Sequence, residues 1–405
     1  VGSGFLGLTL ALRLSEQGNQ VTIYESANEI GGLASVWQIG DVTWDKHYHV
    51  TLLSDSFTRK IVGELGLENE FEWVETKTGF YTDGKLVSMS NTLEFLKFPP
   101  LDLISKFRLG GTIFYASRVK DWKALEKISV EDWLTKLSGK KTFEKMWKPL
   151  LKAKLGEAYK ETSAAFIWAT IQRMYAARNS GLKKEMFGYV RGGYARVLQR
   201  FGEHLREKGV EICLNSRVTN IFTTETQRHR ENKIALEYDH LDSQLSTLDS
   251  FDKVILTCPS NIAAKICPQL TETERIKLKN IKYQGIVCAS LLTKKSLSPY
   301  YVTNITDETP FTGIIEMSAL VDKKEFGGNA LVYLPKYVAP DDELFEKTDA
   351  EIEEKFLAAL EKMYPHFKRE DVLSFKTSRV REVFPIPTLN YSENVPSVKT
   401  SIDGV

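Results

Sequence analysis

The first 25 residues restrict what this chain can fold into more than any other segment. A glycine-rich turn at residues 2–7 (Gly-Ser-Gly-Phe-Leu-Gly) leads into apolar residues at helical spacing, and a strand-like run, Val21–Tyr24, ends at Glu25. Phosphate groups can approach a helix N-terminus where glycines leave the backbone uncovered, and a carboxylate after the second strand can accept hydrogen bonds from ribose hydroxyls. The sequence therefore predicts a dinucleotide-binding βαβ unit. Glu25 would repel the 2′-phosphate of an NADP-type ligand.

A second glycine pair, Gly31-Gly32, stands five residues after Glu25. A unit that binds only NAD has no need of this pair. The arrangement resembles the FAD-binding opening of the superfamily of amine oxidases, phytoene desaturases and protoporphyrinogen oxidases, in which the second pair lets the backbone approach the FAD phosphates. Many members follow the pair with arginine, whereas this chain has Leu33-Ala34. That departure favours the desaturase-like and protoporphyrinogen-oxidase-like branches over monoamine oxidases proper.

Three later segments resemble the same superfamily. Val218 matches a valine whose main chain contacts the adenine, and residues 252–259 match a short strand followed by Thr-x-Pro. Residues 147–156 look like the protoporphyrinogen-oxidase-like signature at the start of a helical region. The resemblance covers most of the chain and is weakest between about 265 and 375. It implies a cofactor site made of Gly2, Gly4, Phe5, Gly7, Glu25, Ser26, Gly31, Gly32, Leu33, Ala34, His47, Val218 and Pro259.

The resemblance implies a mixed α/β fold, in which a Rossmann-like FAD-binding domain carries an inserted substrate domain with a helical subdomain and a mixed sheet. A hairpin turn at Asp83-Gly84 and helical periodicity from Leu93 to Lys184 agree with such an insertion. The FAD-binding domain is expected in two segments, 1–75 and 187–262, which alternate with two segments of the substrate domain, 76–186 and 263–384. An incomplete C-terminal FAD-binding segment is expected at 385–405.

The chain begins inside its glycine motif and stops where members of the family carry a closing strand over the flavin. We therefore expect a fragment that lacks both edges of its cofactor site and binds flavin weakly in isolation.

Candidate catalytic residues are few, because a flavin itself accepts the hydride and the protein orients the substrate. His47 and His49 stand where related proteins have a histidine segment that passes the flavin, and on a strand they would point the same way. Their alternative role is structural hydrogen bonding. A buried Lys154 could hold a water or a substrate carboxylate near the flavin ring; the alternative for Lys154, and more so for Lys152, is a solvated helix face.

Two arginines, Arg191 and Arg381, are further candidates for anionic substrate groups, or else form surface ion pairs. Aromatic residues could line an apolar substrate pocket, although most of them are expected in the core. They are Trp168, Tyr175, Phe187, Tyr189, Tyr283, Tyr333 and Phe384.

Composition excludes several other classes of function. The net charge of +1 leaves no electrostatic footprint for nucleic acid, and four cysteines without a C-x-x-C pair argue against a zinc site or a disulfide scaffold. The sequence contains no stretch of about 20 apolar residues, so it predicts no transmembrane helix. The four cysteines, which show no pairing pattern, fit a location in the reducing cytoplasm best. The segment Phe95–Trp122 mixes apolar and basic residues, so it is either a buried amphipathic helix or a peripheral membrane patch at the inner face of a membrane.

These observations predict an FAD-dependent oxidoreductase that accepts hydride from a C–H or C–N bond of an apolar or amine substrate. An external acceptor such as oxygen or a quinone would reoxidise the flavin. Two alternatives remain at this point: a flavin-dependent isomerase resembling the sugar-nucleotide mutases, and a non-catalytic dinucleotide-binding module. The sequence does not determine the oligomeric state.

Overall fold

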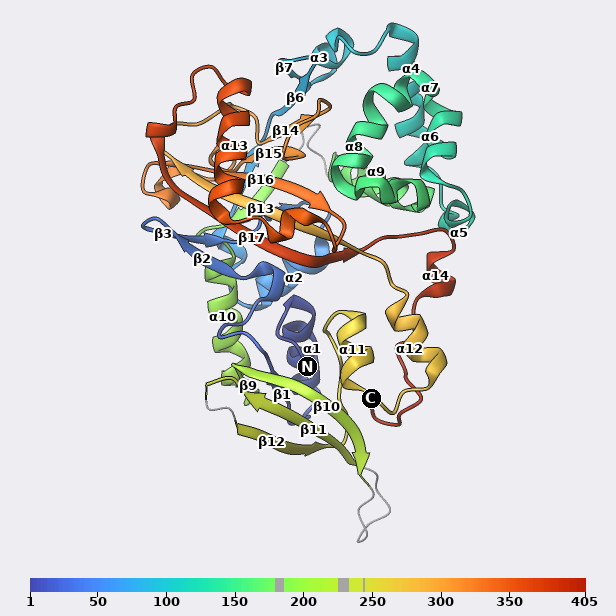
Figure 1. Ribbon diagram of the computed structural model, residues 1–405, viewed down its shortest axis with the longest axis vertical. Helices are drawn as coiled ribbons and strands as arrows, with labels where there is room; N and C mark the ends of the chain where they lie inside the picture. The colour runs from blue at the N-terminus through green and yellow to red at the C-terminus, as the bar shows by residue number, and fades with distance from the viewer. Residues whose placement is uncertain (179–185, 225–232, 243–244) are drawn as a thin grey trace.

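The computed structural model describes residues 1–178, 186–224, 233–242 and 245–405. It has the predicted mixed α/β fold, with both chain termini at the end that carries the glycine loops (Figure 1). A long sheet lies above this end, and a group of helices lies beside the sheet (Figure 1).

The end that carries the glycine loops is built around short parallel segments. Helix α1 (Phe5–Glu16) precedes strand β1 (Thr22–Tyr24), which pairs in parallel with β9 (Glu211–Cys213). The first residues continue this parallel arrangement on the other side of β1: the Gly2 N–H donates to the Tyr24 carbonyl (2.8 Å) and the Thr257 N–H donates to the Val1 carbonyl (3.0 Å). The helix and strand predicted for residues 5–24 are thus confirmed.

A three-stranded antiparallel sheet adjoins this unit. Its strands are β10 (Ser216–Thr224), β11 (Lys233–His240) and β12 (Leu245–Phe251). Ile234, Leu236 and Tyr238 alternate along β11 and bury one face of this sheet.

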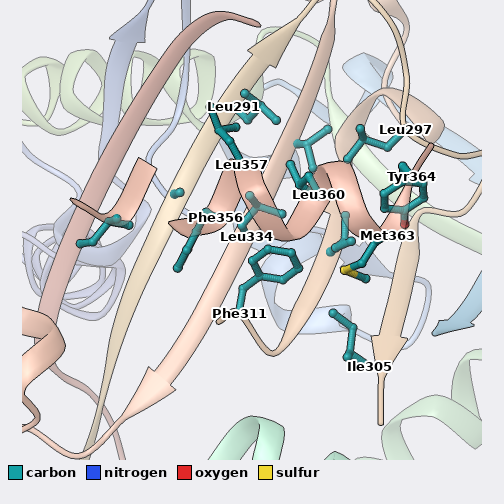
Figure 2. Close-up of a cluster of buried hydrophobic side chains, with 14 of the residues drawn as sticks. Leu291, Leu297, Ile305, Phe311, Leu334, Phe356, Leu357, Leu360, Met363 and Tyr364 are labelled. Carbon is teal, nitrogen blue, oxygen red and sulfur yellow. The ribbon is translucent and has the colours of Figure 1, made fainter. Parts of the chain in front are cut away.

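The large sheet has seven strands in the order β17-β13-β16-β15-β14-β6-β7. In that order they are Val372–Pro385, Tyr283–Thr293, Ala330–Val338, Gly313–Glu316, Val302–Ile305, Thr78–Thr82 and Lys85–Ser88. Strand β13 lies inside the sheet and is buried on both faces. Helix α13 (Asp349–Met363) packs Phe356 and Leu360 onto one face (Figure 2). The other face packs against residues 36–52, which follow the second glycine loop.

The helical group fills residues 92–178, as the sequence predicted for this stretch. Its core gathers buried aromatic side chains, among them Trp133, Phe143 and Trp147. The remaining residues of the predicted helical stretch, 179–184, lie outside the described residues. The helices are α3 (Thr92–Lys97), α4 (Leu103–Ala116), α5 (Trp122–Glu126), α6 (Val130–Ser138), α7 (Lys140–Thr142), a π-helical turn (Phe143–Trp147), α8 (Lys148–Leu155) and α9 (Ala164–Arg178).

Smaller elements connect these regions. They are the hairpin β2 (Val36–Ile39) and β3 (Val42–Asp45), the sheet of β4 (Thr51–Leu52), β8 (Met186–Val190) and β5 (Phe71–Glu75), and the helices α2 (Ser56–Glu64), α10 (Gly193–Glu207), α11 (Ser260–Ile266), α12 (Glu272–Lys279) and α14 (Tyr391–Asn394). Among the described residues, no helix has the length and apolar character needed to cross a membrane.

Candidate cofactor site and active site

The three glycines of the first loop differ in what surrounds them. A Cβ on Gly7 would lie 2.1 Å from the Gly2 carbonyl oxygen, and a Cβ on Gly2 would lie 2.8 Å from the Thr257 hydroxyl. A Cβ on Gly4 would meet no atom of the described protein within 4 Å. Gly2 and Gly7 are therefore needed for packing, whereas Gly4 leaves open space at the start of α1.

The second glycine loop packs directly on the first. The Gly31 N–H donates to the Ser3 carbonyl (3.0 Å), and a Cβ on Gly32 would lie 3.1 Å from the Gly4 Cα. Both Gly31 (φ 125°) and Gly32 (φ 57°) have positive φ values, which side chains other than glycine rarely allow. The two loops thus bring bare backbone together at the N-terminus of α1.

Glu25 lies at the end of β1, beside the first loop. Its carboxylate accepts hydrogen bonds from the Ser3 N–H and hydroxyl (both 2.8 Å) and from the Ala27 N–H (2.9 Å). The Ser216 N–H donates to the Glu25 carbonyl (2.8 Å), so β10 with its buried Val218 starts next to this acid. Glu25 and Val218, which the sequence singled out separately, lie at the same end of the site.

These residues fit an FAD molecule. No side chain caps the N-terminus of α1 within the described chain, so its backbone N–H groups and positive dipole end remain available to phosphate oxygens beside Gly4. In such a complex Glu25, directly after β1, would be the acceptor of ribose hydroxyls that the sequence analysis expects. Other residues in the implied set have different surroundings: Leu33 is exposed, Ala34 is buried, and the Phe5 ring packs edge-on against Phe201 of α10.

Thr257 is a member of this site that the candidate set omitted. Its hydroxyl donates to the Val1 and Gly2 carbonyls (2.9 and 3.1 Å), and it therefore holds the glycine turn in place. Pro259, which the candidate set did include, directly precedes α11. The signal for Thr257 was present in the sequence, because the threonine belongs to the same Thr-x-Pro pattern.

His47 and His49 do not lie on a strand, because β3 ends at Asp45. The His47 Nε2 lies 3.3 Å from the Ser378 hydroxyl on β17, and burial lowers the pKa of His47 to about 4. His49 instead faces the Asp45 carboxylate (3.6 Å) and the Tyr194 ring, beside a small, partly open cavity of about 20 Å³. The two histidines therefore have separate environments.

Lys154 projects from α8 toward the face of the large sheet that meets residues 36–52. Its Nζ donates to the Tyr337 hydroxyl (2.5 Å), and the hydroxyls of Tyr337 and Tyr48 lie 2.9 Å apart. The ammonium also lies over the rings of Tyr337 (3.9 Å) and Phe384 (5.0 Å). One hydrogen-bonded series therefore connects the helical group, strand β16 and the segment after the second glycine loop. His49 does not belong to it.

Burial dominates the electrostatics of this series. It lowers the pKa of Lys154 to about 8, against a smaller opposite effect of the Cys288 thiol, and it raises the pKa of Tyr337 to about 12. No carboxylate forms an ion pair with Lys154 among the described residues. Sequence reasoning found Lys154 but missed both tyrosines as its partners.

The other charged candidates lie on the surface. Lys152 pairs with Glu157 (2.6 Å), Arg191 lies 3.7 Å from Glu72, and Arg381 pairs with the exposed Glu346. Lys152, Arg191 and Arg381 thus have the surface positions that the sequence analysis gave as their alternatives.

A family model described as flavin containing amine oxidoreductase matches residues 7–394. The chain is 25% identical over 255 residues to a probable zeta-carotene desaturase of Synechococcus elongatus, and the alignment covers 56% of this chain and 51% of that protein. It is 22% identical over 324 residues to a hydroxysqualene dehydroxylase of Zymomonas mobilis, covering 76% and 71%. The chain thus spans about half the length of the first of these relatives.

The fold is similar to that of a putative protoporphyrinogen oxidase from Exiguobacterium sp., with a TM-score of 0.73 and 16% identity over 97% of this chain and 88% of that one. The predicted superfamily, the cofactor FAD and the enzyme class, an FAD-dependent oxidoreductase, are confirmed by the family match. The chain belongs to the family of flavin-containing amine oxidoreductases.

Proposed function

We propose that this chain dehydrogenates an apolar substrate, removing a hydride from one carbon and a proton from a neighbouring position. Bound FAD supplies the hydride acceptor, and an external electron acceptor such as oxygen or a quinone restores the oxidised flavin. Two relatives support this choice by their names, a zeta-carotene desaturase and a hydroxysqualene dehydroxylase.

The observation that carries the proposal is the hydrogen-bonded series Lys154–Tyr337–Tyr48 in apolar surroundings. Tyr337 and Cys288 belong to one buried cluster, and Tyr48 and Phe384 pack against that cluster. A site of this kind, apolar with a few fixed polar groups, suits a substrate that is held by shape and burial rather than by charge.

The charge of the site favours an apolar substrate over an amine. A protonated amine would meet the Lys154 ammonium in a desolvated environment without a neighbouring carboxylate to compensate it, which is electrostatically costly. A hydrocarbon has no such cost. We therefore propose that the enzyme oxidises a C–H bond of an apolar substrate rather than a C–N bond of an amine.

In this proposal Lys154 accepts the proton that leaves the substrate. With a pKa of about 8, about a tenth of the lysine is neutral at pH 7 and about half at pH 8. The Tyr337 hydroxyl accepts a hydrogen bond from Lys154 and lies beside the Tyr48 hydroxyl, so it orients the amine and gives its proton a route onward.

The test compares Lys154→Met with Lys152→Met, because both lysines lie on α8 and Lys152 is exposed and paired with Glu157. With a carotenoid-type or squalene-type hydrocarbon as substrate, wild-type turnover should rise with pH through about 8, since the neutral amine is the base. Lys154→Met should lose about a hundredfold or more of this turnover together with the rising limb. Lys152→Met should keep both.

FAD absorbance of each purified variant reports whether the cofactor is still bound. Full turnover and an unchanged pH profile in Lys154→Met, with flavin retained, would remove Lys154 from the reaction.

A further inference from the structure

Helix α4 turns its apolar side chains outward. Ile104 and Phe107 are 74% and 76% exposed, and Leu103, Phe114 and Tyr115 are exposed on the same side. At 3.6 residues per turn these five positions fall on one half of the helix, which we call the α4 face. The helix is fully folded and packed, so this exposure belongs to the native protein.

The side of α4 that faces the protein mixes apolar and polar residues: Leu109 and Ala116 belong to the buried core of the helical group, and Lys106 and Thr112 are buried beside them. Lys106 is buried and its Nζ donates to the Leu96 carbonyl (2.7 Å), while the buried Thr112 hydroxyl lies 2.9 Å from the Ser138 hydroxyl. A helix exposed to water usually carries polar residues on its outer side, whereas the outer side of α4 is mostly apolar. The helix thus buries one side, as the sequence allowed for this segment, and in addition exposes apolar side chains on its outer side.

The surroundings extend the α4 face. Leu93 and Leu96 of α3 and Trp122 of α5 are also exposed, and α3 and α4 lie at the end of the molecule opposite the two chain termini (Figure 1). Scattered exposed apolar residues are ordinary, but a group of this size on adjacent helices marks an interaction surface.

The charged residues around the α4 face indicate the kind of partner that this surface would bind. Residues 92–127 contain seven lysines and arginines but four acidic residues, whereas the whole chain has 54 basic and 53 acidic residues. Helix α4 contains no acidic residue, and its exposed charge is Arg108. Arg118 lies 3.5 Å from the centre of the Phe114 ring, so a guanidinium borders the apolar side chains. Apolar side chains with a basic border complement the boundary between acyl chains and anionic headgroups.

We propose that the α4 face docks on a bilayer containing anionic lipid, with its apolar side chains at the level of the headgroup–acyl boundary. A second copy of the chain fits less well, because α4 carries no acidic side chain that could pair with the basic border of a partner copy. Membrane docking does not depend on turnover, so a negative docking result would not bear on the proposed role of Lys154.

The experiment is sedimentation of the FAD-reconstituted chain with vesicles of phosphatidylcholine, with and without phosphatidylglycerol. The variant Ile104→Ser/Phe107→Ser should lower partitioning to the anionic vesicles about tenfold or more, because two exposed apolar side chains no longer become buried. Phe57→Ser is the matched control, since Phe57 is 86% exposed on α2, and it should bind as the wild type does.

A second pair of variants tests the basic border. Arg118→Gln/Lys120→Gln should weaken binding to the anionic vesicles, and added salt should do the same in the wild type. Lys277→Gln, on α12, should change neither. Equal melting temperatures establish that each variant is folded.

Three results would overturn the docking: no sedimentation of the wild type with either vesicle, equal binding of the wild type and Ile104→Ser/Phe107→Ser, or a loss of binding in Phe57→Ser as large as in that double variant. A dimer in analytical ultracentrifugation that Ile104→Ser/Phe107→Ser dissolves, with vesicle binding unchanged, would assign the α4 face to a second copy instead.

Discussion

At the scale of single residues, Gly4 and Gly7 have separable roles although they belong to one motif. Gly4→Val should leave the protein folded, because a Cβ there meets no protein atom within 4 Å and the backbone at Gly4 is extended. It should lose most of its FAD affinity, since the branched side chain occupies the space where phosphate approaches α1.

Gly7→Ala should act on the fold instead. Its Cβ would lie 2.1 Å from the Gly2 carbonyl oxygen, and overpacking of this kind costs about 1–3 kcal/mol. Urea unfolding and FAD titration of both variants check the pair. Retained FAD affinity in Gly4→Val, or an unchanged unfolding midpoint in Gly7→Ala, would contradict this division of roles.

Some site residues were predictable from sequence because backbone geometry imposes them locally. The glycines and Glu25 depend on contacts that any βαβ unit of this kind must make. The partners of Lys154 were not predictable, because Tyr337 is 183 residues away along the chain and reaches Lys154 only through the packing of α8 on β16. Aromatic residues in a strand are usually interpreted as core, and Tyr337 also belongs to the core.

At the scale of elements, the N-terminus of α10 depends on a side chain from a different segment. The buried Asp45 carboxylate accepts a hydrogen bond from the Tyr194 N–H (2.9 Å), and a Cβ on Gly193 would lie 3.0 Å from that carboxylate. Asp45 therefore caps α10 and fixes the chain between the second glycine loop and the histidines.

Asp45→Ala should lower the free energy of unfolding by about 1–2 kcal/mol, the usual cost of losing a helix cap. The exposed Asp41→Ala, in the turn between β2 and β3, should change it little. Denaturant unfolding monitored by circular dichroism measures both. Equal stabilities of the two variants would show that α10 does not depend on Asp45.

Helices and strands with a local apolar periodicity were predictable from the sequence, whereas the path of segments that depends on tertiary contacts was not. Helix α1 and strand β1 follow from local apolar spacing, and both are present. Residues 47–49 form no strand, because the chain bends after Asp45 to reach α10 and β17. No local pattern in residues 45–49 indicates that bend.

At the scale of the whole molecule, the sequence predicted the fold class and the cofactor but not how the elements face one another. The expected domain boundaries remain predictions. The spacing of α4 indicates an amphipathic helix, but only packing shows that Ile104 and Phe107 point outward while Lys106 and Thr112 satisfy their hydrogen bonds inside. The same packing joins residues 36–52 to the large sheet and so completes the surroundings of Lys154.

The central claim is that the chain uses FAD to oxidise an apolar substrate. Anaerobic titration of the FAD-reconstituted protein tests it most directly, with a carotenoid-type or squalene-type hydrocarbon delivered in lipid vesicles in one series and putrescine in the other. We predict that the hydrocarbon bleaches the flavin absorbance and that the diamine does not. Bleaching by putrescine alone, or by neither compound in a protein that has taken up FAD, would contradict this claim.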